Sequence, residues 1–457
     1  MARKKDLALK FLFIPAVILL VLGGCGRDNT VSIRKFPYPY KAALAICSDI
    51  DETETIKESL TIQEFLNTSH STRFGQGLNL EIGNSFWFYN QCLDIDGGTF
   101  IDSLTLATKF TGGLDFGISI FKGTSDSLSD YTPLLLRLIK AGYIDGLHSY
   151  GNFTEHQFQR ALAERALAFL KKDSLTIETF INHGGYENTQ NIGKAPWFYG
   201  DNSGALEYHT DLTIPAGIKF LWRGQVTHCI GQDALFSPVN LIKQSYEYLQ
   251  DQLHTKQQYP HDNKLVHIYQ LDDGQKIFEF ARFISPWGKY PEADENHLAD
   301  QLGSSQINQL ISNQGYMILY THFGKGNGTE FLSPSTIAAL RYIKKRNDDS
   351  SLMVTTTTKL LNYYIHSKYL YWHTVEKPDS VIIMIDSIVN EIEGKLLPDA
   401  DDLEGLTFYI PDNKAIAIKE SGRFLQYIAN AADGTGRKSI SLPWRHLQFP
   451  ADISLSR

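Results

Sequence analysis

Short apolar runs alternate with helix-like repeats along most of this chain. An apolar run of strand length is typical of a buried strand, and apolar positions three and four residues apart are typical of the inner face of a helix. Strands are predicted at 41–48, 80–89, 116–121, 144–148, 179–182, 217–222, 276–283, 316–321 and 352–355. Helices are predicted at 55–67, 131–141, 154–171, 296–313, 333–346 and 359–368. The alternation indicates an α/β fold with parallel strands, and its length of about 330 residues favours a (β/α) barrel over a small open sheet.

After residue 368 the pattern changes. Short apolar runs at 381–386, 405–410, 414–418 and 424–428 are separated by Pro, Asp and Gly, without a long helical repeat. This pattern is typical of a small all-β unit. We therefore expect the (β/α) domain at 41–368 and a sandwich-like β domain at 369–457.

The N-terminus reads as a targeting segment. Basic residues precede an uninterrupted apolar run at 11–22, which has the length of a signal-peptide core and is short for a membrane span. The run ends in the tetrapeptide Leu-Gly-Gly-Cys, which closes at Cys25 and resembles the bacterial lipobox. The resemblance implies a signal peptide at 1–24, a lipid on Cys25 that ties the protein to a bacterial membrane without spanning it, and a tether at 25–40. An uncleaved signal anchor and a plain secretory signal are the alternatives.

Composition excludes several classes of protein. The chain is 42% hydrophobic and 21% charged, which is globular rather than disordered or coiled-coil composition. Its net charge of -8, without a basic stripe, excludes nucleic acid as the expected partner. Four cysteines without a CxxC pair exclude a zinc-finger array and a disulfide framework. Cys47 ends an apolar run and is expected to be a buried thiol, with a bridge to Cys92 as the alternative.

Polar residues gather where predicted strands end. They are Asp49 and Asp51, His148 and Ser149, Asn182 and His183, and His322. Because the carboxyl ends of parallel strands share one edge, these side chains are expected to converge. Carboxylates and imidazoles together suit a divalent metal, Zn²⁺ first and Mn²⁺, Co²⁺ or Fe²⁺ next. Taken singly, each of these residues also fits a cap, a turn or a backbone hydrogen bond.

Three of these segments resemble motifs of the polysaccharide deacetylase family, the NodB-homology carbohydrate esterases. Residues 49–52, Asp-Ile-Asp-Glu, are similar to the spaced form of its paired-aspartate motif. Residues 148–152, His-Ser-Tyr-Gly-Asn, are similar to its His-Ser/Thr-x-x-His motif, and residues 319–322, Leu-Tyr-Thr-His, to its last motif. The resemblance implies a distorted (β/α) barrel and metal-dependent removal of N- or O-acetyl groups from a polysaccharide of the cell envelope or the extracellular space.

The resemblance also implies roles for individual residues. Asp49 would be the general base and His322 the general acid. The metal ligands would be Asp51, His148 and Asn152. Tyr150, Asn182 and His183 are candidates for binding the substrate.

The sequence departs from the family pattern at two places. Asn152 stands where the motif has its second histidine, and an amide oxygen binds Zn²⁺ less well than an imidazole does. His156, four residues later, is an alternative ligand. The family's arginine-proline motif, whose arginine orients the base, is replaced by Asn182-His183-Gly184-Gly185.

Two other functions stay open. A glycan-binding or assembly protein with a degenerate site is favoured by Asn152 and by the missing arginine. A glycoside hydrolase would need two carboxylates roughly 5–10 Å apart, for which Asp272, Asp273 and Glu279 are candidates. A metal at Asp51 and His148 would distinguish the deacetylase from both.

Overall fold

The structure is a computed structural model of the chain. It describes residues 30–50, 53, 55–91, 99–102, 107–110, 118–153, 157–184, 187–253, 258–287, 293–324 and 330–451. Cys25, Asp51, Cys92 and His156 lie outside these ranges, and so do the predicted signal peptide and the first part of the predicted tether. Within the described ranges, no helix has both the length and the apolar character that a membrane span requires.

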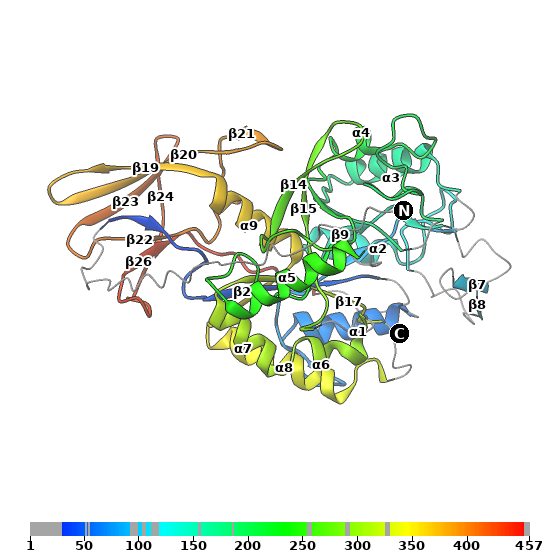
Figure 1. Cartoon of the computed structure of the whole chain (residues 1–457), viewed down its shortest axis with the longest axis horizontal. Helices are drawn as coiled ribbons and strands as arrows, with labels where there is room; N and C mark the ends of the chain where they lie inside the picture. Colours follow the sequence, from blue (N-terminus) through cyan, green and yellow to red (C-terminus); the bar gives the residue numbers. More distant parts are fainter. Residues whose placement is uncertain are drawn as a thin grey trace, which may run out of the picture.

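One large, mostly parallel sheet forms the centre of the molecule (Figure 1). Its strands are β2 (Ala42–Ser48), β5 (Gly83–Phe86), β9 (Ile144–His148), β11 (Thr179–Ile181), β12 (Phe220–Trp222), β13 (Val226–Thr227), β14 (Val266–Gln270), β15 (Lys276–Phe280), β16 (Arg282–Phe283), β17 (Tyr316–Thr321) and β18 (Leu352–Thr355). They follow the order β13-β16-β17-β2-β5-β9-β11-β12-β15-β14, and β18 pairs with the first part of β2 while β5 pairs with its last part. Among the described strand pairs of this sheet, only β14–β15 is antiparallel.

The expected (β/α) barrel is wrong. In such a barrel each strand is followed by a covering helix and the first and last strands pair. Here β13 and β14 end the strand order, and no pairing between them occurs among the described residues. Between β11 and β12 the described chain forms only the four-residue helix α4 (Thr210–Thr213). The fold is instead a β-rich mixed α/β fold around a curled sheet.

The helices begin at residues that suit helix starts. The N-cap side chains of Thr55, Ser237 and Ser333 each accept a hydrogen bond from the backbone three residues on, and proline follows the last two. The helices are α1 (Ile56–Asn67), α2 (Thr132–Lys140), α3 (Arg160–Lys172), α5 (Pro238–Gln252), α6 (Leu298–Gln301), α7 (Ser304–Asn313), α8 (Pro334–Asp348) and α9 (Thr357–Tyr369). Figure 1 shows α1, α6, α7 and α8 together on one side of the sheet.

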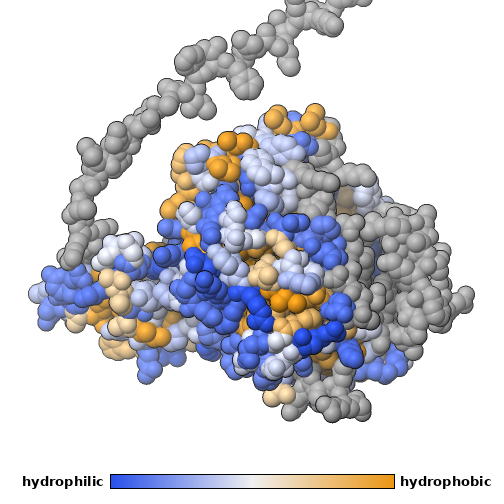
Figure 2. Space-filling view, turned by 90° about the horizontal axis from the view of Figure 1, so that it is seen from below, coloured by the Kyte–Doolittle hydropathy of each residue, from blue (hydrophilic) through white to orange (hydrophobic). Residues whose placement is uncertain are grey.

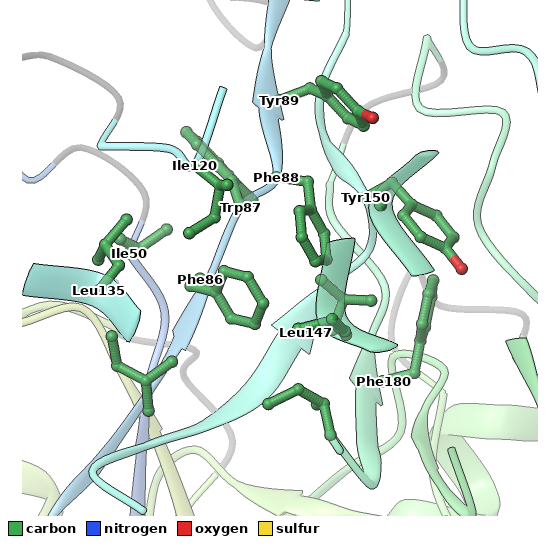
Figure 3. Packing of buried hydrophobic residues seen from close by; sticks show 14 of the residues in the cluster. Ile50, Phe86, Trp87, Phe88, Tyr89, Ile120, Leu135, Leu147, Tyr150 and Phe180 are labelled. Carbon is green, nitrogen blue, oxygen red and sulfur yellow. The ribbon is translucent and has the colours of Figure 1, made fainter. Parts of the chain in front are cut away.

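The core is divided by the sheet. All seven residues of β2 are buried, and alternate side chains enter two different hydrophobic clusters, as the pleat of a strand requires. Figure 3 shows a third cluster, in which Phe86 and Phe88 pack near Leu147, Tyr150 and Phe180. The expectation of a buried thiol at Cys47 is confirmed, because this residue is free and buried.

The C-terminal part contains the expected short strands in two smaller sheets. One sheet holds β19 (Leu370–Glu376), β20 (Ser380–Asn390), β21 (Gly394–Leu396), β23 (Ala415–Glu420) and β24 (Arg423–Leu425). The other holds β1 (Ser32–Ile33), β22 (Thr407–Tyr409), β25 (Ile428–Asn430) and β26 (Ser439–Ser441). The end of the expected tether is therefore paired with the C-terminal part. The domain boundary at residue 368 stays a prediction.

Three short strand pairs complete the described elements. The first is the parallel pair β6 (Tyr89–Asn90) and β10 (Gly151–Asn152), which lies next to residues of the candidate site. The other pairs are β3 (Ser71–Thr72) with β4 (Gly75–Gln76), and β7 (Thr99–Asp102) with β8 (Ala107–Phe110).

Candidate active site

The polar residues at the strand ends share one edge of the sheet. β17, β2, β5, β9 and β11 are consecutive parallel neighbours, so their carboxyl ends lie side by side. The backbone extends these pairings: Asp49 N donates to Thr321 O over 3.0 Å, and Asn182 N donates to Trp222 O over 3.0 Å. The segments that carry Asp49, His148, His183 and His322 therefore meet at this edge.

Asp49 is held by a buried arginine. Arg282, the first residue of β16, donates from Nη1 to Asp49 Oδ2 over 2.8 Å and from Nη2 to Asp49 Oδ1 over 3.1 Å. Both side chains are fully buried. The guanidinium lies 4.1 Å from the ring centroid of Trp222 and 4.9 Å from that of Tyr320. Burial lowers the pKa of Arg282, but the Asp49 carboxylate outweighs this effect and raises the pKa above its ordinary value.

A line of polar contacts runs from Asp49 through two histidines. Ser85 Oγ donates to Asp49 Oδ1 over 3.1 Å and lies 3.2 Å from His148 Nδ1, which is itself 3.5 Å from Asp49 Oδ1. His148 Nε2 lies 3.0 Å from His183 Nδ1. His183 Nε2 in turn lies 3.1 Å from Asn152 Oδ1. Asn152 thus supports His183, whereas the resemblance makes it a metal ligand.

The outer partners of the two imidazoles determine where their protons lie. A neutral imidazole carries one N–H. With the amide oxygen of Asn152 as assigned, His183 Nε2 donates to it, and His148 Nδ1 donates towards Asp49 and Ser85. With the protons on these outer nitrogens, the lone pairs of both inner nitrogens are available to a cation, whereas in the other tautomers one inner nitrogen donates to the other across 3.0 Å. In the first arrangement His148 Nε2 and His183 Nδ1 are a donor pair that suits a divalent metal.

The third expected ligand lies outside the described residues. Asp51 follows Asp49 by two positions and is the carboxylate that the resemblance assigns to the metal. Within the described ranges, no cluster of three or more His, Cys, Asp or Glu side chains could hold a metal ion. The described part of the site therefore supplies two imidazoles, and a carboxylate from Asp51 would complete a set of three.

The other predicted site residues occupy different surroundings. His322 is buried and its Nδ1 donates to the carbonyl oxygen of Ala293, which fixes the ring next to the end of β17. Asn182 exchanges two hydrogen bonds with the backbone of Ile192 and so closes the loop after β11. Tyr150 is fully buried and its hydroxyl lies 2.6 Å from Thr213 Oγ1, so its side chain belongs to the core.

The carboxylates proposed for a glycoside hydrolase make structural contacts. Glu279 accepts from Arg223 Nε over 2.8 Å, inside the sheet. Asp273 Oδ2 accepts from Thr210 Oγ1 over 2.6 Å and from Tyr208 over 3.2 Å. These contacts hold strands and loops together, and they give no support to a catalytic carboxylate pair.

Some residues of the site were not found from the sequence. They are Arg282 and Ser85. Trp87 is an aromatic residue that, from the sequence alone, suits the core better than a sugar-binding platform. The ring of Trp87 stands edge-on to both imidazoles, with centroids 6.0 Å from His148 and 5.2 Å from His183. Ser85 lies in the middle of the predicted strand 80–89, where nothing in the sequence distinguishes it from its neighbours.

Comparison with known proteins adds no assignment. Models of known families, curated proteins and solved structures all gave no match to this chain. The function is therefore argued from the residues of the site.

Proposed function

We propose that the protein is a metal-dependent deacetylase that removes N- or O-acetyl groups from a polysaccharide. The observation that carries this proposal is the 3.0 Å approach of His148 Nε2 and His183 Nδ1, with an ion-paired Asp49 next to them. The proposal depends on the site and on the resemblance of its motifs, and not on the fold, because the expected barrel is wrong.

The reaction assigns a step to each residue. Hydrolysis adds water to the acetyl carbonyl carbon and breaks the C–N or C–O bond, which yields acetate and a free amine or hydroxyl. A divalent metal held by His148, His183 and Asp51 would polarise the acetyl carbonyl and acidify the attacking water. Asp49 accepts the proton of the water, and His322 donates a proton to the leaving nitrogen or oxygen.

Two positioning residues replace the missing family features. Arg282 is bonded to both oxygens of Asp49, which fixes the orientation of this carboxylate and places a positive charge beside it. Asn152 accepts from His183 Nε2, which directs Nδ1 of His183 towards His148. His183 thus takes the role that the family gives to its second histidine.

Metal content is the first test. The purified full chain is incubated with Zn²⁺, Mn²⁺ or Co²⁺, dialysed and subjected to elemental analysis, together with His148→Ala and His183→Ala. The matched control is His373→Gln, because His373 is half exposed on β19 and pairs with Asp386. Near-stoichiometric metal in the wild type and the control, lost in both other variants, is the expected result. A chain that binds no metal, or variants that keep it, would contradict the assignment.

Acetate release then tests the reaction. Acetylated chitooligosaccharides and acetylated plant polysaccharides distinguish N- from O-deacetylation. Asp49→Asn is expected to keep its metal and to lose turnover by about 10²–10⁴-fold, the usual contribution of a general base. Unchanged turnover in this variant would refute the role of Asp49 as base.

A glycan-binding protein with a degenerate site is the second candidate. It is favoured by the sequence, which has Asn152 in place of the motif's second histidine and no arginine in 182–185. Retention on a polysaccharide column without metal or acetate release would support this candidate.

We further propose that the protein acts outside the cytoplasm, bound to a bacterial membrane through a lipid on Cys25. The support is the lipobox-like tetrapeptide that ends at Cys25. The mass of the N-terminal peptide of the membrane-extracted protein tests this, and an unmodified Cys25 would contradict it.

A further inference from the structure

Helix α5 (Pro238–Gln252) has its polar side inwards. Asn240, Lys243 and Glu247 are almost completely buried, with exposed fractions of 2%, 1% and 1%. Helices at the surface of a soluble domain usually bury the apolar stripe and expose the charged one. In α5 the polar side is therefore buried, which is the reverse of the usual arrangement.

Hydrogen bonds fix this orientation. Asn240 exchanges hydrogen bonds with the backbone of Ile230, at 3.2 Å and 3.1 Å. Lys243 Nζ donates to His228 O over 2.8 Å, and Glu247 Oε1 accepts from His228 N over 2.5 Å. Rotating the helix would leave these buried groups without partners, so its outer face is set by its inner face.

The outer face of α5 and its flanks are apolar. Ile242, Leu249 and Leu253 follow each other at spacings of seven and four, which places them on one stripe. In Figure 1 the helix lies in front of the sheet, and Figure 2 shows that apolar residues form clusters on the surface between hydrophilic ones. The exposed apolar residues are Leu235 (56%), Phe236 (81%), Val239 (41%), Leu241 (49%), Ile242 (61%), Tyr248 (55%), Leu249 (59%) and Leu253 (72%). We call this set the α5 face.

The N-terminal segment passes next to the α5 face. Lys35 Nζ donates to the backbone oxygen of Asp233, two residues before Leu235, and to Gln314 O over 2.6 Å. Ten residues separate Lys35 from Cys25, and ten extended residues span at most about 35 Å. A lipid on Cys25 would therefore keep the α5 face within a few tens of ångströms of the bilayer.

We propose that the α5 face rests on the bilayer to which the chain is anchored and thereby orients the protein on the membrane. The occupant is the headgroup and upper acyl region of a phospholipid bilayer, where an interfacial helix buries its apolar side chains about 5–10 Å deep. Tyr248 suits this depth, because tyrosine favours the membrane–water interface. Lys243 and Glu247, two of the three charged residues in 235–253, point away from the bilayer.

The proposal rests on the lipid at Cys25 and is independent of deacetylase activity. The lipid would hold the chain at the bilayer, and the apolar face would fix its orientation there. The same face would also orient the candidate active site relative to the membrane, because Glu247 of α5 is bonded to Thr227 of β13, a strand of the sheet that carries the site.

Depth-dependent fluorescence quenching tests the proposal. The lipidated full chain, in a Cys92→Ser background, is labelled at Leu249→Cys with an environment-sensitive dye and reconstituted into vesicles of phosphatidylethanolamine and phosphatidylglycerol with brominated acyl chains. The two described native cysteines do not compete, because burial raises the pKa of the Cys47 and Cys229 thiols to about 12. The matched control is Phe424→Cys, which is 66% exposed on β24.

Brominated lipid is expected to quench the label at 249 and to leave the label at 424 at its value in unbrominated vesicles. The added change Ile242→Asp is expected to remove the quenching at 249. Equal quenching at both positions would overturn the proposal, and so would cross-linking of 249 to 249 between chains, which would assign the face to a second copy. An unmodified Cys25 peptide in the same sample would overturn it too, and acetate release by that sample reports separately on the proposed activity.

Discussion

Replacing Arg282 with leucine isolates the buried ion pair of the candidate site. Arg282 and Asp49 are both completely buried, and two hydrogen bonds of 2.8 Å and 3.1 Å join them. Arg282→Leu keeps much of the side-chain volume against Trp222 and removes the charge. The Asp49 carboxylate then stays in the interior without its counter-ion.

The expected cost follows from this burial. Removing one partner of a buried ion pair destabilises a protein by about 3–5 kcal/mol. At about 2 °C per kcal/mol for a large folding unit, the melting temperature falls by about 6–10 °C. The surface pair Arg160–Asp211 provides the matched control, since it is also doubly bonded but its side chains are 34% and 39% exposed. Arg160→Leu is expected to cost less than about 1 kcal/mol.

Thermal unfolding of the wild type, both single variants and Asp49→Asn/Arg282→Leu measures these differences. The double variant is expected to lose less than the sum of its two single changes, because each single change leaves a buried group without its partner. Arg282→Leu melting no lower than Arg160→Leu would refute the reasoning, since it would mean that the interior around Asp49 tolerates this carboxylate without the arginine.

Three further predictions concern the backbone, a buried histidine and the support of His183. Gly151→Ala is expected to cost more than about 2 kcal/mol, because its φ is +149° and an added Cβ would lie 2.0 Å from the carbonyl oxygen of Tyr89 in β6. At Gly184 an added Cβ meets no atom of the described residues within 4 Å, so Gly184→Ala should melt like the wild type. Burial lowers the pKa of His209 to about 4. As the pH falls below about 6.5, the histidine therefore becomes protonated in the unfolded chain before it does in the folded one. The free energy of unfolding is expected to fall by up to about 3 kcal/mol between pH 6.5 and about pH 4. Urea unfolding of the wild type and of His209→Asn at several pH values measures this loss. The same dependence of the unfolding free energy on pH in both proteins would contradict the prediction. Asn152→Leu removes the amide oxygen that faces His183 Nε2. A competition titration should show metal affinity weakened by about 10–100-fold. An unchanged affinity would mean that Asn152 does not orient the ring.

The apolar runs located the central strands well. The predicted strands 144–148, 316–321 and 352–355 coincide with β9, β17 and β18. Such strands are buried on both faces, so their composition marks them without information from the rest of the chain.

Elements that depend on distant contacts were misplaced. The helix predicted at 154–171 begins later than expected, because α3 starts at Arg160 and its N-cap residue Gln159 is extended. Phe158 stacks on Tyr150 at 5.5 Å and meets the ring of His209 edge-on at 5.7 Å, which holds it in the core before the helix. Helix α5 was not predicted at all.

The barrel prediction failed for the same reason. Strand and helix alternation in the sequence does not show which strands pair. The predicted strand 276–283 divides at Ala281 into β15, next to β12, and β16, next to β17, at opposite ends of the strand order. No local pattern carries that division.

The sequence predicted the site residues that stand at strand ends. It missed the residue that belongs to the site only through its side-chain partner. Asp49, His148, His183 and His322 all follow or end strands, and the parallel sheet brings their segments to one edge. Arg282 lies inside a predicted strand, and its partner Asp49 is 233 positions away, so no spacing in the sequence relates the two.

The two departures from the family motifs acquire a common explanation in this geometry. The sequence lacks an arginine in the loop after β11, yet Arg282 from β16 is bonded to the same aspartate that such an arginine would orient. The sequence has Asn152 for a histidine, yet His183 approaches His148 to 3.0 Å and Asn152 supports it from behind. A site that had merely lost function would have no reason to recover both contacts from other strands, since a buried arginine–carboxylate pair is costly to maintain. A rearranged active site therefore explains the two departures better than a degenerate one, and metal binding by His148 and His183 is the property that distinguishes the two.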